Sequence, residues 1–459
     1  MRISSRGPLR AAWVRSIGAH WERIAKSDLG GRLARGVFWS IAGAAVSRGL
    51  MLLASILVAR LLGQIGYGEF GMIRSTVSMF AVFAGFALGM TATKNIAENY
   101  RSDPIKAGRI WAISETFALA AGALVAIIIF LFAPWLAERT INAPHLVPEI
   151  RIGACILLLN GLNGAQTGAL AGFEAFRAIA VVNLGVGLAS FPLLVCGAWW
   201  GGVRGAVWAL LVIMLLNWLF NYLALRRVAA CHKVALTFSG CTKELPILWT
   251  FSLPAALSGI MVSPVLWAGN ALLVNQSGGY EQMAIFDAAN QWRIAVLFIP
   301  GAVGQVVLPM LASLVDDNEV ARFRKVLKYN VVLNAGLGLV TAGIIATAAP
   351  WIMRSYGTAF AAGSQVLALL ALSAVLASVS QVVGQAIASK GEMWVGFAMN
   401  LLWATALLLS GYWLMSRGYG AMGLAIAYVF AYLLHMVWVG LYVWRVTARS
   451  PIPQVLDSE

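Results

Sequence analysis

Residues 109–132 read RIWAISETFALAAGALVAIIIFLF, and no charged residue follows Glu115 in this stretch. An α-helix of about 20 apolar residues is long enough to cross the ~30 Å hydrocarbon core of a bilayer. Eleven further stretches of this kind occur at about 36–61, 72–90, 150–172, 179–200, 205–225, 246–274, 282–310, 330–352, 364–388, 393–415 and 421–444. The sequence therefore predicts an all-α polytopic membrane protein with about 12 transmembrane helices.

The overall composition agrees with this class. Of the 459 residues, 60% are hydrophobic and only 11% are charged, whereas about 25% are charged in an average soluble domain. Four cysteines in so long a chain do not form a disulfide framework. Cys155 and Cys196 are expected at similar depth in neighbouring helices, and whether they are bonded is left open.

The net charge of +15 is explained by topology. If the chain crosses the membrane twelve times, 24 Lys and Arg residues lie on the side of both termini and about six on the opposite side. Basic loops are retained in the cytoplasm, so we expect both termini to be cytoplasmic. This distribution removes the main reason to expect a nucleic-acid partner.

The chain repeats itself at an offset of about 213–218 residues. Gly66-Tyr67 matches Gly279-Tyr280, and LAGFE at 170–174 parallels ASKGE at 388–392. A duplicated unit with six spans keeps its orientation, so the halves should be related by an axis along the membrane normal, around a central cleft. The predicted segments are a basic arm at 1–35 (an interfacial amphipathic helix or a disordered tail), an N-lobe at 36–225, a linker at 226–245, a C-lobe at 246–445 and a tail at 446–459.

Five charged residues fall inside predicted spans: Arg48, Arg74, Glu115, Asp287 and Arg293. A charge at mid-membrane costs ~2.5–3.5 kcal/mol on insertion scales and normally faces protein or a watery cavity. Arg48 and Arg293 are the deepest, and the guanidinium group is suited to bidentate phosphate binding. We therefore predict a cationic cleft for a phosphate-bearing cargo. The alternative is that each arginine pairs with a nearby acid, Glu115 or Asp287.

The predicted site also includes acids and uncharged polar residues. Glu115 and Asp287 are the acids within spans, so coupling to H⁺ or Na⁺ would run through one of them. Purely structural pairing of these acids is the alternative. No cofactor, metal or catalytic motif is indicated, and we do not expect an enzyme. The predicted cavity-lining side chains are Ser47, Ser55, Ser78, Asn290 and Gln291.

The repeat also predicts a contact between the lobes. Aligning the two Gly-Tyr steps places Arg74 opposite Asp287, and we predicted both near the periplasmic ends of their helices. Equivalent positions of the two lobes approach one another if those helices line the cleft. Arg74 and Asp287 are therefore a candidate periplasmic gate. The alternative is that each residue bonds within its own lobe.

Two segments resemble a known family. LVARLLGQIGYGEFGMIRSTVSMF at Leu57–Phe80 resembles the end of helix 1 and start of helix 2 in the polysaccharide biosynthesis and export family. AIFDAANQWRIAVLFIPGAVGQVVLPMLASL at Ala284–Leu314 is similar to helix 8 of that family, with Phe286 in place of the usual Tyr. In number and length of helices the resemblance covers essentially the whole chain.

This resemblance implies a Wzx-type flippase of the multidrug/oligosaccharidyl-lipid/polysaccharide (MOP) superfamily, with the fold of MATE transporters. Such a protein moves undecaprenyl-pyrophosphate-linked oligosaccharide across the bacterial inner membrane by alternating access. The implied partners are this lipid-linked glycan, membrane lipids, and polysaccharide polymerase and chain-length proteins. The alternatives are a MATE-type multidrug or cation antiporter, a multispan glycan polymerase or ligase, and a scaffold role, because fold alone does not determine function.

The two deep arginines give the first testable prediction. Alanine at Arg48 or Arg293 should abolish surface glycan while membrane abundance stays near normal, because the pyrophosphate loses a charge-assisted bidentate partner. Lysine should restore transport only in part, since it keeps the charge and loses the planar fork. Surface polysaccharide and protein abundance are measured in a complemented deletion strain. Full transport by the Arg48→Ala, Arg293→Ala double variant would refute the prediction.

Overall fold

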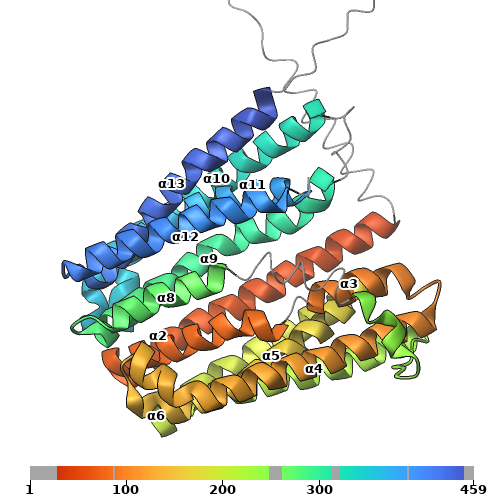
Figure 1. The fold of residues 1–459 in the computed structure, drawn as a ribbon, viewed down its shortest axis with the longest axis horizontal. Coiled ribbons are helices and arrows are strands. Elements are labelled where there is room, and N and C mark those ends of the chain that lie inside the picture. Colours follow the sequence, from red (N-terminus) through yellow and green to blue (C-terminus); the bar gives the residue numbers. More distant parts are fainter. Residues whose placement is uncertain (1–27, 86–87, 248–260, 313–319, 390–391, 449–459) are drawn as a thin grey trace, which may run out of the picture.

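The computed structural model describes residues 28–85, 88–247, 261–312, 320–389 and 392–448. Every regular element in these ranges is helical (Figure 1), as expected. The predicted amphipathic helix of the N-terminal arm lies outside the described residues. The α-helices are α2 (Asp28–Gly85), α3 (Leu88–Asn99), α4 (Pro104–Trp135), α5 (Val147–Gly172), α6 (Phe176–Cys231), α8 (Val262–Val274), α9 (Gly279–Ala312), α10 (Val320–Tyr356), α11 (Ser364–Ser389), α12 (Met393–Ser416) and α13 (Gly420–Ala448).

Two of these helices fold back on themselves. A straight helix of 58 residues, the length of α2, would be about 87 Å long, far more than one membrane crossing needs. The helix instead reverses at Gly63, whose φ of +70° suits a residue without Cβ. Ser55 and Tyr67 therefore meet in a hydrogen bond across the turn, although a straight helix would hold them about 18 Å apart. A second reversal, at Gly201 and Gly202, divides α6.

The described residues contain eight helical segments long and apolar enough to cross a membrane. Two of the eight, Gly43–Asn99 and Phe176–Cys231, include the reversals, so each is divided into two arms. α8 and α9 fall outside the eight, and residues 248–260 and 313–319 beside them are not described. The all-α fold is as expected, and the number twelve remains a prediction.

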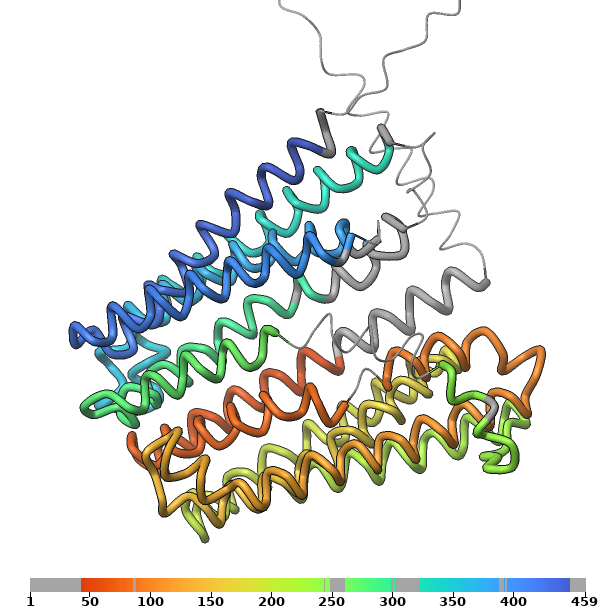
Figure 2. The backbone as a smooth tube through the Cα atoms, viewed as in Figure 1, coloured from red at the N-terminus to blue at the C-terminus, as the bar shows by residue number. Residues whose placement is uncertain are grey.

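The helices form two bundles, which Figures 1 and 2 show one above the other. We call α2–α6 the first bundle and α8–α13 the second. Within each bundle neighbouring helices pack closely, and the contacts between bundles are made mainly by α2 with α8 and α9. The bundles meet at one end, here called the closed end, and diverge toward the other, where α2 begins and α13 ends (Figure 1). The predicted lobe boundaries and the central cleft stay predictions.

Backbone turns support the internal repeat. Left-handed φ values occur at Gly63, Asn142 and Gly202, and again at Gly278, Gly357 and Gly418. The corresponding positions are 215, 215 and 216 residues apart. Such φ values are uncommon outside glycine and asparagine. The matching order and spacing therefore indicate that both halves turn the chain in the same way.

Glycines bring helices of the first bundle into close contact. A Cβ added to Gly168 in α5 would overlap the backbone carbonyl of Gly89 in α3, whereas one added to Gly164, a single turn earlier, would meet no atom within 4 Å. Small residues allow helix backbones to approach in this way inside membranes. The packing of α3 on α5 therefore depends on Gly168 and tolerates a side chain at Gly164.

This difference gives a matched pair of variants. Gly168→Ala should lower the free energy of unfolding by about 1–3 kcal/mol, because the backbones must separate. Gly164→Ala should be neutral or slightly stabilising, since alanine favours helix by up to about 1 kcal/mol over glycine. Detergent-induced unfolding of the purified protein measures both. Equal stability of the two variants would contradict the packing described here.

Candidate functional site

An ion pair joins the two bundles. Arg74 of α2 donates from Nη2 to both carboxylate oxygens of Asp287 in α9, at 3.0 and 2.9 Å. The side chains are 21% and 9% exposed, so the pair is largely shielded from solvent and is screened less than a surface pair. The structure thus brings together the two residues that the repeat places opposite one another.

Small residues let α2 and α9 come close enough for this contact. A Cβ on Gly68 would overlap the backbone of Tyr280, and one on Gly71 would lie 3.0 Å from the carboxylate carbon of Asp287. Arg74 also lies over the ring of Phe70, with its guanidinium carbon 5.2 Å from the ring centre. A cation on an aromatic face gains further stabilisation in a desolvated setting.

The ion pair lies deeper than expected. The sequence predicted a span at about 72–90, with Arg74 near its start. In the structure the helix resumes directly after Gly63, so Arg74 lies about 16 Å along it. Asp287 lies eight residues, or about 12 Å, into α9. The pair is therefore about 12–16 Å from the turns at Gly63 and Gly278, and its role as a periplasmic gate stays a prediction.

A buried polar layer lies beside the ion pair. Ser55 and Tyr67 of α2 share a hydrogen bond of 2.5 Å, and Tyr67 packs edge-on against Tyr356 of the second bundle. Tyr356 Oη accepts a hydrogen bond from Trp292 Nε1 at 3.1 Å. Ser55 is buried and its hydroxyl is bonded to Tyr67, and its place in the lining of a cavity stays a prediction.

Nearby hydrogen bonds connect α8 to α2. Asn270 Nδ2 donates to Ser75 Oγ at 2.8 Å, and Trp267 Nε1 donates to Thr76 Oγ1 at 3.0 Å. Both donors belong to the second bundle and both acceptors belong to the first. Separating the bundles would leave these groups without partners in a poorly hydrated region, which costs free energy.

The rim of the closed end is held by bonds to backbone. Arg60 Nε donates to the Ser355 carbonyl at 2.6 Å, Tyr280 Oη to Ile141 at 2.8 Å, and Asn275 Nδ2 to Thr140 at 2.7 Å. Each bond runs from one bundle to the other. The sequence could not predict these three bonds, because every residue has a backbone carbonyl and no residue type marks the one that accepts.

Arg48 points from the first bundle toward the second. Its guanidinium carbon lies 5.7 Å from the ring centre of Phe298 in α9, and its side chain is exposed. In the described part of the chain no carboxylate pairs with it. Ser47 instead packs against Gly187 of α6, inside its own bundle. Ser78 is exposed.

Arg293 is placed differently from Arg48. Only 6% of it is exposed, and it donates from Nε to Ser373 Oγ at 3.0 Å and from Nη2 to Tyr432 Oη at 3.3 Å. It also lies over the ring of Tyr428, at 5.1 Å. These partners belong to α11 and α13. Neither arginine is paired with an acid among the described residues, and joint binding of a pyrophosphate by the two stays a prediction.

The remaining predicted polar residues have mixed surroundings. Asn290 and Gln291 are half-buried, and Asn290 Oδ1 is a buried oxygen without a hydrogen-bond partner among the described atoms. Cys155 and Cys196 are free thiols. No group of three metal-ligating side chains occurs in the ranges that the structure covers.

Glu115 lies inside the first bundle. Its partners differ from those of Asp287. Its carboxylate accepts a hydrogen bond from Gln166 Nε2 at 3.1 Å. Asn163, one turn before Gln166 on α5, donates to the Met214 carbonyl of α6 at 3.2 Å. Glu115 is thus held at the junction of α4, α5 and α6.

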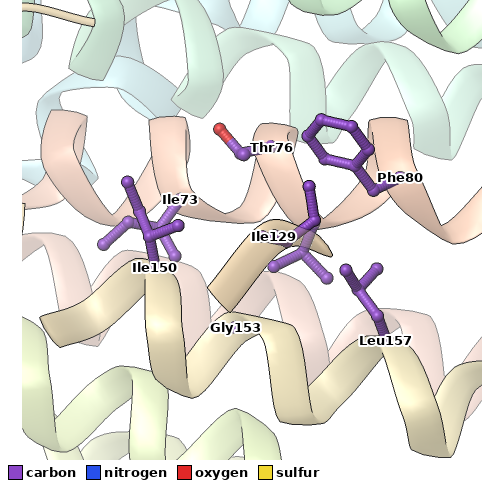
Figure 3. Close-up of a pocket in the computed structure, with 8 residues that line it drawn as sticks. Ile73, Thr76, Phe80, Ile129, Ile150, Gly153 and Leu157 are labelled. Atoms are coloured by element: carbon purple, nitrogen blue, oxygen red, sulfur yellow. The ribbon is translucent and has the colours of Figure 1, made fainter. Parts of the chain in front are cut away.

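The apolar crevice in Figure 3 is not part of this site. It lies between α2, α4 and α5, and its lining residues include Ile73, Phe80, Ile129 and Leu157. It has no volume open to water, so we regard it as a packing defect of the first bundle rather than a place for a ligand.

The chain is similar to known proteins in both sequence and fold. The sequence pattern of a family described as "Polysaccharide biosynthesis protein" matches residues 33–315. The EPS I polysaccharide export inner membrane protein EpsE of Ralstonia nicotianae is 27% identical over 407 residues, covering 85% of this chain and 89% of the relative. The expected family is therefore confirmed.

Solved structures show the same fold. An inward-facing multidrug resistance MATE transporter of the MOP superfamily aligns with a TM-score of 0.71 and 16% identity, covering 90% of this chain and 100% of that one. An outward-facing transporter of the same description gives a TM-score of 0.65 at 15% identity, covering 92% and 97%. The MATE-like architecture expected from the sequence is confirmed.

The ion pair between the bundles gives a prediction on stability. A double-mutant cycle of Arg74→Ala and Asp287→Ala should yield a coupling of about 1–3 kcal/mol, because two contacting charges are largely removed from solvent. The exposed pair of Arg101 and Glu174, at 3.5 Å with side chains 76% and 54% exposed, is the control and should couple by less than about 1 kcal/mol. Additive effects at Arg74 and Asp287 would show that their contact contributes no coupling.

Proposed function

We propose that this chain, which belongs to the polysaccharide biosynthesis protein family, moves a polyprenyl-pyrophosphate-linked oligosaccharide across the bacterial inner membrane. Location in the inner membrane and a role in polysaccharide export are what the name of the Ralstonia relative states for that protein. They agree with the membrane-length helices of this chain. The twelve-span topology and the glycan cargo are parts of the same proposal.

The orientation follows from charge. The 24 basic residues counted on the side of the termini place that side in the cytoplasm. The closed end lies opposite the start of α2 and the end of α13 in Figure 1, so in this proposal it faces the periplasm and the bundles diverge toward the cytoplasm. This inward-facing state is supported by the higher of the two TM-scores, which belongs to the inward-facing transporter.

The observation that carries the mechanism is the Arg74–Asp287 ion pair. It joins equivalent helices of the two bundles at their point of closest approach. We propose that it latches the inward-facing state and breaks when the periplasmic side opens. A coupling of 1–3 kcal/mol changes a two-state equilibrium by roughly 5–150-fold, which biases the equilibrium without freezing it.

Arg48 is our candidate for the first contact with the pyrophosphate. Its guanidinium faces the other bundle on the side away from the latch, and its described contact is an aromatic ring rather than an acid. It is therefore available for a bidentate bond to phosphate oxygens. Arg293 would have to leave Ser373 and Tyr432 to do the same, so we assign it second place. An exposed arginine between the bundles also argues against a cation antiporter.

Depletion of the protein tests this function. Lipid-linked oligosaccharide should accumulate on the cytoplasmic leaflet and surface polysaccharide should fall, because the cargo no longer crosses. Wild-type protein should restore both, and Arg48→Ala should restore neither. Arg417→Ala, which removes an exposed arginine that lies over Trp413, is the control and should complement fully. Normal flipping of the lipid-linked glycan in depleted cells would eliminate the proposed function.

The same assay tests the latch. Arg74→Asp should reduce surface polysaccharide, because two acids then face one another. Adding Asp287→Arg should restore much of it, because the ion pair is rebuilt in reverse. If the double variant is no better than the worse single variant at equal abundance, these residues do not act as a latch.

A further inference from the structure

We propose that Glu115, Gln166 and Asn163 form a binding site for a monovalent cation, with Na⁺ as the ligand, inside the first bundle. The site is separate from the contact between the bundles. It deepens the proposed function by naming a place for a coupling ion, but binding at the site can be measured without glycan or transport.

The first observation is an acid without a cationic partner. Glu115 is half-buried in a segment of membrane-spanning length. In the described part of the chain no Lys, Arg or His nitrogen lies within 4.0 Å of its carboxylate. Its described polar contact is the neutral amide of Gln166. An ionised carboxylate in such surroundings is costly unless a proton or a cation neutralises it.

The second observation is a pair of buried amide oxygens without partners. Gln166 is 1% exposed and Asn163 is 6% exposed. Both amide nitrogens are bonded, whereas Gln166 Oε1 and Asn163 Oδ1 have no hydrogen-bond donor among the described atoms. A buried acceptor left without a donor costs about 1–3 kcal/mol, so two of them on successive turns of one helix need an explanation.

A cation explains both observations at once. Hard cations prefer carboxylate and amide oxygens as ligands. The two ends of a side-chain amide can exchange places by rotation. In one position Gln166 donates to Glu115, and in the other its oxygen lies beside the carboxylate. Two oxygens side by side repel one another unless a cation or a proton lies between them, so cation binding and amide rotation would be coupled.

Asp287 fits this role less well than Glu115. Both of its carboxylate oxygens already accept bonds from Arg74, so its charge is balanced within the protein. The sequence treats the two acids as equivalent candidates for ion coupling, and the contacts separate them. One acid is bonded to an arginine between the bundles, and the other lies beside orphaned oxygens within a bundle.

The test measures binding in the purified full-length protein in nanodiscs. The midpoint of thermal unfolding is followed as NaCl replaces choline chloride at constant ionic strength, and ²²Na⁺ binding is measured in parallel. For wild type we expect a midpoint that rises with Na⁺ concentration and saturates, because a ligand that binds only the folded state stabilises it.

Glu115→Gln should abolish the Na⁺-dependent shift and the bound ²²Na⁺ while the protein still elutes as a folded species. Asn163→Ser, which keeps an oxygen ligand on a shorter side chain, should weaken binding several-fold. Glu98→Gln, at an exposed acid of α3, is the matched control and should bind Na⁺ as wild type does. An equal Na⁺ response in wild type and Glu115→Gln, or none in wild type, would overturn the site. Na⁺ binding in a protein that does not move glycan would leave the site intact and remove the proposed function.

Discussion

The ion pair between Arg74 and Asp287 is the interaction on which the arrangement of the two bundles depends. Its charges lie about 12–16 Å from the turns of the closed end, where little water is available to replace a lost partner. The surrounding features serve this contact: Gly68 and Gly71 let the helices approach, and hydrogen bonds from α8 to α2 close the same layer. Moving one bundle against the other therefore requires a substitute for each of these partners.

Much of the fold could be predicted because the bilayer imposes simple rules on sequence. Long apolar stretches and asymmetric basic loops need no knowledge of neighbouring helices. The contact of Arg74 with Asp287 could be predicted from the internal repeat. A repeat indicates which positions of the two halves face one another, whereas helical periodicity indicates only which residues share a face of one helix. The predicted span began near residue 72, whereas the helix resumes directly after Gly63, and Gly68 and Gly71 allow it to pack closely on α9.

The environment of the individual polar residues could not be predicted in the same way. Helical periodicity places Ser55 and Arg48 on one face, but it does not say that Tyr67 folds back to meet Ser55 across the Gly63 turn. Arg293 and Arg48 looked equivalent by depth, yet one is enclosed by hydroxyl and aromatic groups of α11 and α13 and the other faces the opposite bundle. Which neighbour a side chain finds depends on how the helices are assembled.

The ion pair joins two residues that the alignment of Gly66-Tyr67 with Gly279-Tyr280 makes equivalent, and this has a consequence for how such a protein arose. In a symmetric dimer of identical six-helix units, each residue at this point would meet its own copy. The contact would then hold two arginines or two aspartates, which repel one another. An attractive pair became available only after the two copies shared one chain and diverged in sequence. On this alignment an attractive contact requires that fusion came before the present pair, and the difference between Arg74 and Asp287 would disfavour assembly of either half with a second copy of itself.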